Sequence, residues 1–120
     1  MNPPMLAPCP SSPNCVSTQA QDEGHAIEPI RYRKSRAEAK EALKEVIRSM
    51  PRTKLVEEDE TYLHYEATSL LLRFVDDVEF LLDDETKTIH FRSASRIGYG
   101  DLGVNRKRME QVRALVEQRL

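Results

Sequence analysis

The chain has 120 residues, a formal net charge of -2 and a charged fraction of 32%. That length suffices for one domain with a modest core. The slightly acidic balance excludes a generic polyanion binder and argues against nucleic acid as a partner. No apolar run approaches the roughly 18 residues of a membrane-spanning helix, so no membrane span is predicted in this chain.

The first part of the chain is rich in cysteine, proline and serine and lacks a periodic apolar pattern. We therefore predict an extended segment at residues 1–25 and an α+β domain at residues 26–120. Cys9 and Cys15 bound the turn-rich stretch Cys-Pro-Ser-Ser-Pro-Asn-Cys. Three interpretations stay open: a loop without a bridge, a local disulfide favoured by an oxidising compartment, and a metal site that would add His25. The spacing matches no standard zinc pattern, so no metal is predicted.

The remaining elements follow in chain order. Alternating apolar residues around Pro29 predict a short edge strand at residues 27–32. Ser35 and Glu38 form a capping box before a helix that continues to Met50 and ends at Pro51. Strands are expected at residues 54–58 and 62–68, and an extended apolar segment at 70–82 pairs with a strand at 88–95 as a hairpin. Beyond a glycine-rich junction, apolar residues at helical spacing predict a closing helix that ends near Leu120.

This β-α-β-β-β-β-α order predicts the α+β class, with a single two-layer domain in which two helices cover one face of an antiparallel sheet. Alternation along the predicted hairpin then assigns side chains to faces. The residues expected to face the helices are Phe74, Val78, Phe80, Ile89 and Phe91.

Asp76 shares that helix-facing side and lies close to Ser93 and Ser95 in the expected register. A buried carboxylate needs partners, and the candidates are these two serines, Asn105 and an arginine of the closing helix. In the structural interpretation, Asp76 joins the sheet to the last helix. In the alternative, Asp76, Ser93 and Ser95 form a hydrolase-like site. The structural interpretation is favoured, because no histidine accompanies these residues in the same motif.

The opposite face of the hairpin is predicted to be polar. Asp77 and Glu79 are expected to lie near His90 and Arg92 in a cross-strand cluster of opposite charges.

The junction between the last strand and the last helix combines glycines with cations. Asp101 or Asn105 can cap the helix. Arg106, Lys107 and Arg108 fall in its first turn, which is the unfavourable end for positive charge. Either acidic groups of the protein or an external anion must offset them. The predicted structural network consists of Asp76, Asp77, Ser93, Ser95 and Asp101, and the predicted anion-binding residues are Arg92, Arg96, Asn105 and Arg106.

Three motifs, at residues 9–20, 73–80 and 92–108, together resemble the domain-of-unknown-function 1499 family. The resemblance covers nearly the whole chain. It implies a common bacterial and plastid domain with no assigned activity and no catalytic residues to transfer. It also implies relatives that carry an export or membrane segment before the cysteine motif. As written, the chain is expected in the cytoplasm, because no secretory signal is visible. The alternative is a periplasmic or membrane-associated protein whose export segment is missing here.

Three functions remain in competition. The first is a small binding module for an anionic ligand or an acidic protein surface, without enzymatic activity or cofactor. The second is the hydrolase-like enzyme that uses Asp76, Ser93 and Ser95. The third is a structural or partner-binding protein of an envelope or membrane-associated system, which an exposed apolar patch would favour.

Overall fold

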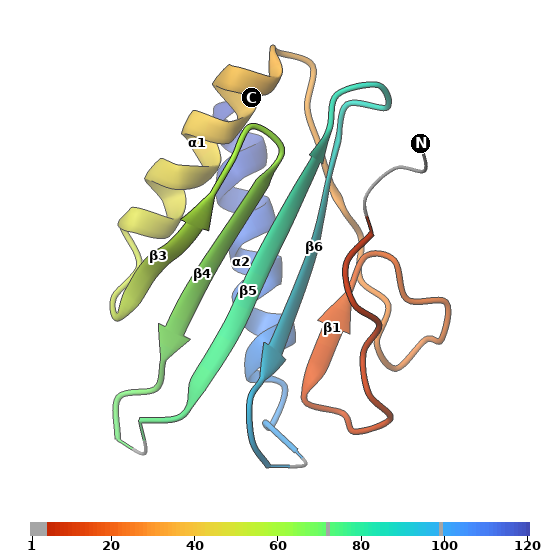
Figure 1. The fold of residues 1–120 in the computed structure, drawn as a ribbon, viewed down its shortest axis with the longest axis vertical. Helices are drawn as coiled ribbons and strands as arrows, with labels where there is room; N and C mark the ends of the chain where they lie inside the picture. The colour runs from red at the N-terminus through yellow and green to blue at the C-terminus, as the bar shows by residue number, and fades with distance from the viewer. Residues whose placement is uncertain (1–4, 72, 99) are drawn as a thin grey trace.

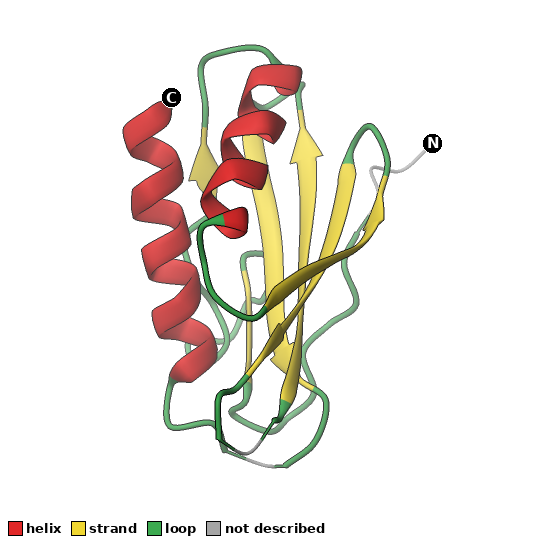
Figure 2. Cartoon of the chain, turned by 90° about the vertical axis from the view of Figure 1, so that its left-hand side faces the viewer, coloured by secondary structure: helices red, strands yellow, loops and turns green. Residues whose placement is uncertain are grey.

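Two helices lie next to each other on one face of a six-stranded antiparallel sheet in the computed structural model, which describes residues 5–71, 73–98 and 100–120 (Figure 1). Figure 2 shows both helices on the same side of the sheet, which confirms the predicted two-layer α+β fold. The strands are β1 (Cys15–Ser17), β2 (Ile30–Arg31), β3 (Thr53–Glu58), β4 (Tyr62–Thr68), β5 (Val75–Asp83) and β6 (Thr88–Ser95), and the helices are α1 (Arg36–Arg48) and α2 (Val104–Arg119).

The sheet has the order β1-β6-β5-β4-β3, and β2 also pairs with β6. Strands β1 and β2 occupy successive stretches of the same edge of β6, where Val16 pairs with Ser93 and Ile30 with Ile89. Strand β1 was not predicted, because three residues are too short to show an alternating pattern. The predicted strand at 27–32 is also shorter in the structure, where only Ile30–Arg31 form β2. The division of the chain at residue 25 stays a prediction.

Helix α1 begins at the predicted capping box. The Ser35 hydroxyl accepts a hydrogen bond from the Glu38 amide, and the Glu38 carboxylate accepts one from the Ser35 amide. Its buried face then packs Leu43 and Val46 onto the sheet, as the helical spacing indicated. Phe80, Phe91 and the other predicted helix-facing residues Val78 and Ile89 are buried in the same core.

Phe74 is the exception, and the prediction for it was wrong. Strand β5 begins at Val75, so the described residues of 69–74 form a loop that joins β4 to β5. Arg73 has φ 57°, which turns the chain just before the strand. As a result the Phe74 side chain remains 45% exposed. The predicted extended segment at 70–82 therefore starts too early, and its residue Leu72 lies outside the described residues.

Candidate functional site

A buried ion pair joins the sheet to helix α2. The Arg108 guanidinium donates to Asp76 Oδ2 at 2.8 Å, and Asp76 is only 6% exposed. The other terminal nitrogen of Arg108 donates to Ser93 Oγ at 3.3 Å and to Asn105 Oδ1 at 3.0 Å. An arginine of the closing helix was among the predicted partners of Asp76, and the structure supplies it.

Asn105 lies at the centre of this network and has no exposed surface. Its side-chain oxygen accepts from Ser93 Oγ at 2.6 Å, and its amide group donates to Ser95 Oγ at 3.0 Å and to Asp101 Oδ2 at 2.7 Å. Asp101 also accepts the main-chain amides of Gly103 and Asn105 at the start of α2. The N-cap residue differs from the prediction: it is Gly103, with φ 78°, a conformation that glycine adopts without steric cost. Asp101 accepts its hydrogen bonds from a position two residues before the cap.

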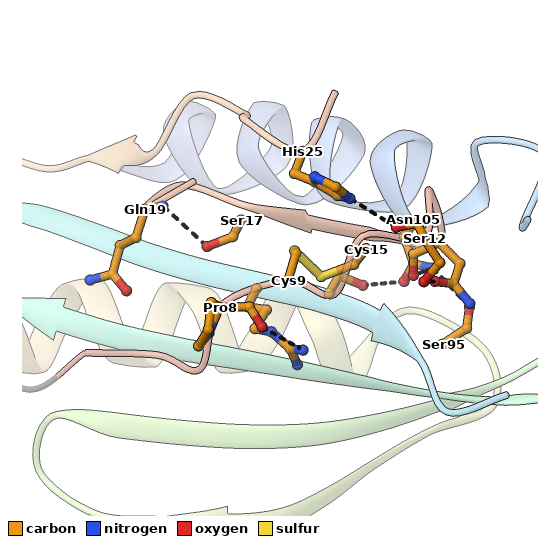
Figure 3. The surroundings of a disulfide bond; sticks show 12 residues. Pro8, Cys9, Ser12, Cys15, Ser17, Gln19, His25, Ser95 and Asn105 are labelled. Atoms are coloured by element: carbon orange, nitrogen blue, oxygen red, sulfur yellow. Dashed lines mark hydrogen bonds between the residues drawn. A yellow bond between two sulfur atoms is a disulfide. The ribbon is translucent and has the colours of Figure 1, made fainter. Parts of the chain in front are cut away.

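The cysteine segment is bridged and bound to the same network. Cys9 and Cys15 form a disulfide, the second of the three interpretations, and Figure 3 shows it with Ser95 and Asn105 near the far end of its loop. Asn14 lies within that loop and is 3% exposed. Its side chain donates to the carbonyl of Gly98 at 2.9 Å, and its own carbonyl accepts from the Ser95 amide at 3.0 Å. The disulfide loop therefore holds the start of the β6–α2 connection.

The face of the sheet opposite the helices carries a second polar network. Asp77 accepts from Arg96 Nε at 2.8 Å and lies 2.8 Å from His64 Nε2. Hydrogen bonds from Arg96 are the largest cause that holds the pKa of Asp77 below its usual value. Arg96 is also bound to Glu66 at 2.5 Å.

The predicted cluster of Asp77, Glu79, His90 and Arg92 is only partly present. Glu79 faces Arg92 at 3.6 Å, as expected. His90 instead lies opposite Leu81 and contacts Thr18.

The four predicted anion-binding residues do not converge. Arg92 of β6 and Arg96, which directly follows the strand, lie on the side of the sheet that points away from the helices, because they alternate with the helix-facing Ser93 and Ser95. Asn105 is buried between the layers. Arg106 is separate from all three and donates to the Gly24 carbonyl at 3.2 Å. It lines a cavity of about 360 Å³ together with Gly24, Asp101 and Leu102.

Six of the nine exposed large apolar side chains among the described residues lie in or beside the β4–β5 and β6–α2 connections. Figures 1 and 2 place both connections at the same end of the sheet. Each of these six side chains is between 45% and 96% exposed. We call them the apolar tip: Leu70, Leu71, Phe74, Ile97, Leu102 and Val104. This surface was not predicted, because residues 70–74 were expected to form part of an extended segment. Two sequence features could have indicated it: the apolar run that follows Ser69, and the isolated large apolar residues within the glycine-rich junction.

The comparisons with known proteins give one match. A family model described as a protein of unknown function (DUF1499) matches residues 5–116. No curated protein and no solved structure matches the chain. Among the described residues, no helix is long and apolar enough to cross a membrane, and no group of three or more His, Cys, Asp or Glu could hold a metal ion.

The buried ion pair yields a stability prediction. Arg108→Ala leaves Asp76 as an uncompensated buried carboxylate, so we expect the free energy of unfolding to fall by about 3–5 kcal/mol. Urea denaturation followed by circular dichroism measures the change. Lys107→Ala serves as the matched control, since Lys107 is exposed in the same turn, and should change stability by no more than about 0.5 kcal/mol. Equal losses in both variants would contradict the assignment.

The pKa values of two histidines should be shifted in opposite directions from the usual value of 6.5. The Ser12 carbonyl and the Asp22 carboxylate accept hydrogen bonds from His25 and raise its pKa, whereas burial lowers the pKa of His90. His25 therefore stabilises the fold at low pH, and this contribution disappears as the pH rises through its folded pKa. His90 has the opposite sign, so its contribution is complete only above its unfolded pKa.

A pH titration of the imidazole resonances by NMR tests this order directly. Asp22→Asn should lower the pKa of His25 and leave that of His90 unchanged. Deprotonation of His25 at a lower pH than His90 would refute the prediction.

Proposed function

The chain belongs to the DUF1499 family, whose description assigns no activity, and we propose from its geometry that it is a non-enzymatic docking module that engages a partner through the apolar tip. The observation that carries the proposal is the concentration of exposed apolar side chains on two neighbouring connections. Leu71 is 87% exposed and Leu102 is 96% exposed. Single exposed apolar residues are ordinary on a protein surface, but a cluster of this kind is typical of an interaction site.

The scaffold beneath the tip is well fixed by hydrogen bonds. The Ser69 amide donates to the Phe74 carbonyl at 2.9 Å and closes the β4–β5 connection. The Arg96 amide donates to the Val75 carbonyl at 3.1 Å, which joins the bases of the two connections. The apolar side chains are therefore presented by a supported backbone, which reduces the ordering cost of binding.

The local backbone also favours a functional role for the tip. Leu102 has φ 56°, and Arg73, next to Phe74, has φ 57°. A left-handed conformation costs a residue with a side chain about 1–2 kcal/mol. Arg52 and Lys87 adopt the same conformation in turns outside the tip, so the conformation alone does not mark a site; Leu102 differs from them in holding a large apolar side chain in solvent. Leu102 has this strained backbone although its side chain is almost completely exposed. Contacts within the domain therefore do not explain why a large apolar residue occupies this position.

The hydrolase-like alternative receives no support from the geometry. Ser93 has no exposed surface and Asp76 is bound to Arg108. The Ser93 hydroxyl also donates to Asn105. A substrate would have to displace α2 to reach these groups, so their contacts favour the structural role.

We retain an anion site as a second candidate, restricted to Arg106. The observation that favours it is the cavity beside Arg106. Arg106 forms no ion pair with a described residue, whereas Arg96 is bound to two carboxylates. The proposed roles of Arg92, Arg96 and Asn105 in anion binding have no comparable support.

Thermal unfolding with inorganic phosphate tests the anion site. Phosphate should raise the melting temperature of the wild-type protein, and Arg106→Ala should abolish the increase, because it removes the guanidinium that binds the anion. Arg96→Ala is the control and should retain the increase. An equal response of the wild type and Arg106→Ala would exclude Arg106 as the anion ligand.

Photo-crosslinking tests the docking function without assuming the nature of the partner. With p-benzoylphenylalanine in place of Leu102, irradiation in a cell extract that contains membranes should give specific adducts, because this side chain contacts the partner. Mass spectrometry then identifies each adduct as protein or lipid. The same residue in place of Val56, which is exposed on β3, is the matched control. Adducts of equal yield and identity at both positions would rule out a specific role for the tip.

A further inference from the structure

We propose that the apolar tip docks into the interface of a lipid bilayer that carries anionic headgroups. This inference rests on the docking function above and names its partner.

The tip protrudes and does not form a groove. The molecule measures 37 × 30 × 23 Å, and both connections lie at one end of its long axis (Figure 1). Leu71 and Leu102 extend into solvent with little contact to neighbouring residues, as their exposed fractions show. A folded protein partner would need a matching hollow for each connection. A fluid interface adapts to protruding side chains, which is how apolar residues of peripheral proteins enter the boundary between headgroups and acyl chains.

Four cations lie in or beside the two connections, against one carboxylate, Asp101, which accepts hydrogen bonds from amides at the start of α2. Arg73 lies between the apolar residues of the β4–β5 connection, and Arg106 and Lys107 follow Val104 in the first turn of α2. Arg52 donates to the Thr68 carbonyl at the base of the same connection. None of these four cations forms an ion pair with a described residue. Each cation near an anionic leaflet strengthens binding by about fivefold.

The opposite end of the molecule has a different composition. Glu58 at the end of β3 is followed by Asp59 and Glu60 in the β3–β4 turn, and Asp83 at the end of β5 is followed by Asp84 and Glu85 in the β5–β6 turn. Lys40 and Lys44 pair with Glu58, and Lys87 pairs with Asp84, so these turns are partly neutralised by neighbouring cations. The net charge of -2 opposes adsorption of the whole protein on an anionic surface. The tip carries more cations than carboxylates, whereas the opposite end is acidic, so the charge pattern orients the tip toward an anionic membrane.

The expected depth is shallow. Irregular connections leave main-chain polar groups that the hydrocarbon core cannot satisfy. The hydrogen-bonded ends of the two connections and the nearby guanidinium groups therefore stay among the lipid headgroups. Only the apolar side chains reach deeper, to the boundary with the acyl chains. This mode of attachment is peripheral and reversible.

Flotation of the full chain with lipid vesicles tests the proposal. We expect it to float with vesicles of phosphatidylcholine mixed with phosphatidylglycerol, and to float at least several-fold less with phosphatidylcholine alone. Leu71→Ser combined with Leu102→Ser should weaken binding by at least about tenfold, because two large side chains no longer leave water. Arg73→Glu should weaken it in a salt-dependent way.

Matched substitutions away from the tip serve as controls. Val56→Ser removes an exposed apolar residue from β3, and Arg33→Glu reverses an exposed cation near the beginning of α1. Both should bind vesicles like the wild type, and circular dichroism should show that every variant is folded. Wild-type protein that fails to float, floats equally with both vesicle types, or is unaffected by the serine substitutions would overturn the lipid assignment. Protein adducts at position 102 without flotation would preserve the docking function and reject the membrane as its partner.

Discussion

The pairing of Asp76 with Arg108 inside the interface between sheet and helices is the constraint on which the rest of the structure depends. A carboxylate at 6% exposure requires a cation, and α2 supplies it from its first two turns. That requirement fixes the position of α2 relative to the start of β5, where Asp76 pairs with Ser95 of β6. Asn105 extends the same network to Ser95 and Asp101, so the start of the helix and the end of the strand become one bonded unit.

The apolar tip follows from this arrangement. With the ends of the β6–α2 connection held by buried polar contacts, the residues between them have no space in the core. Asn14 also holds this connection, because its side chain donates a hydrogen bond to the Gly98 carbonyl. Asn14 belongs to the loop that the Cys9–Cys15 disulfide closes. Closing so short a loop stabilises the fold by about 2 kcal/mol in the chain-entropy model. The disulfide thus supports the backbone that presents the tip, although no sulfur atom lies in the tip itself.

The sequence predicted the elements with strong local signals and missed those set by tertiary context. The capping box of Ser35 and Glu38 and the alternation that placed Asp76 toward the helices are both present in the structure. Strand β1 was missed because its stability comes from pairing with β6. Residues 70–74 were assigned to a strand because apolar content indicates burial only on average. The turn at Arg73 has no glycine to mark it in the sequence.

The arginines of the junction between β6 and α2 have different partners in the structure, and for this reason their closeness in sequence did not predict a shared binding site. Arg92, Arg96, Arg106 and Arg108 are close in sequence, yet the structure distributes them among three environments. The alternation along β6 already separated Arg92 and Arg96 from the helix-facing side, so a shared cradle with Arg106 conflicted with the same reasoning that placed Asp76 correctly. Cations that balance internal carboxylates cannot also bind a ligand without breaking those pairs. Of the cations in and beside the junction, Arg106 and Lys107 form no ion pair with a described residue and remain available for a partner, next to the apolar side chains of the tip.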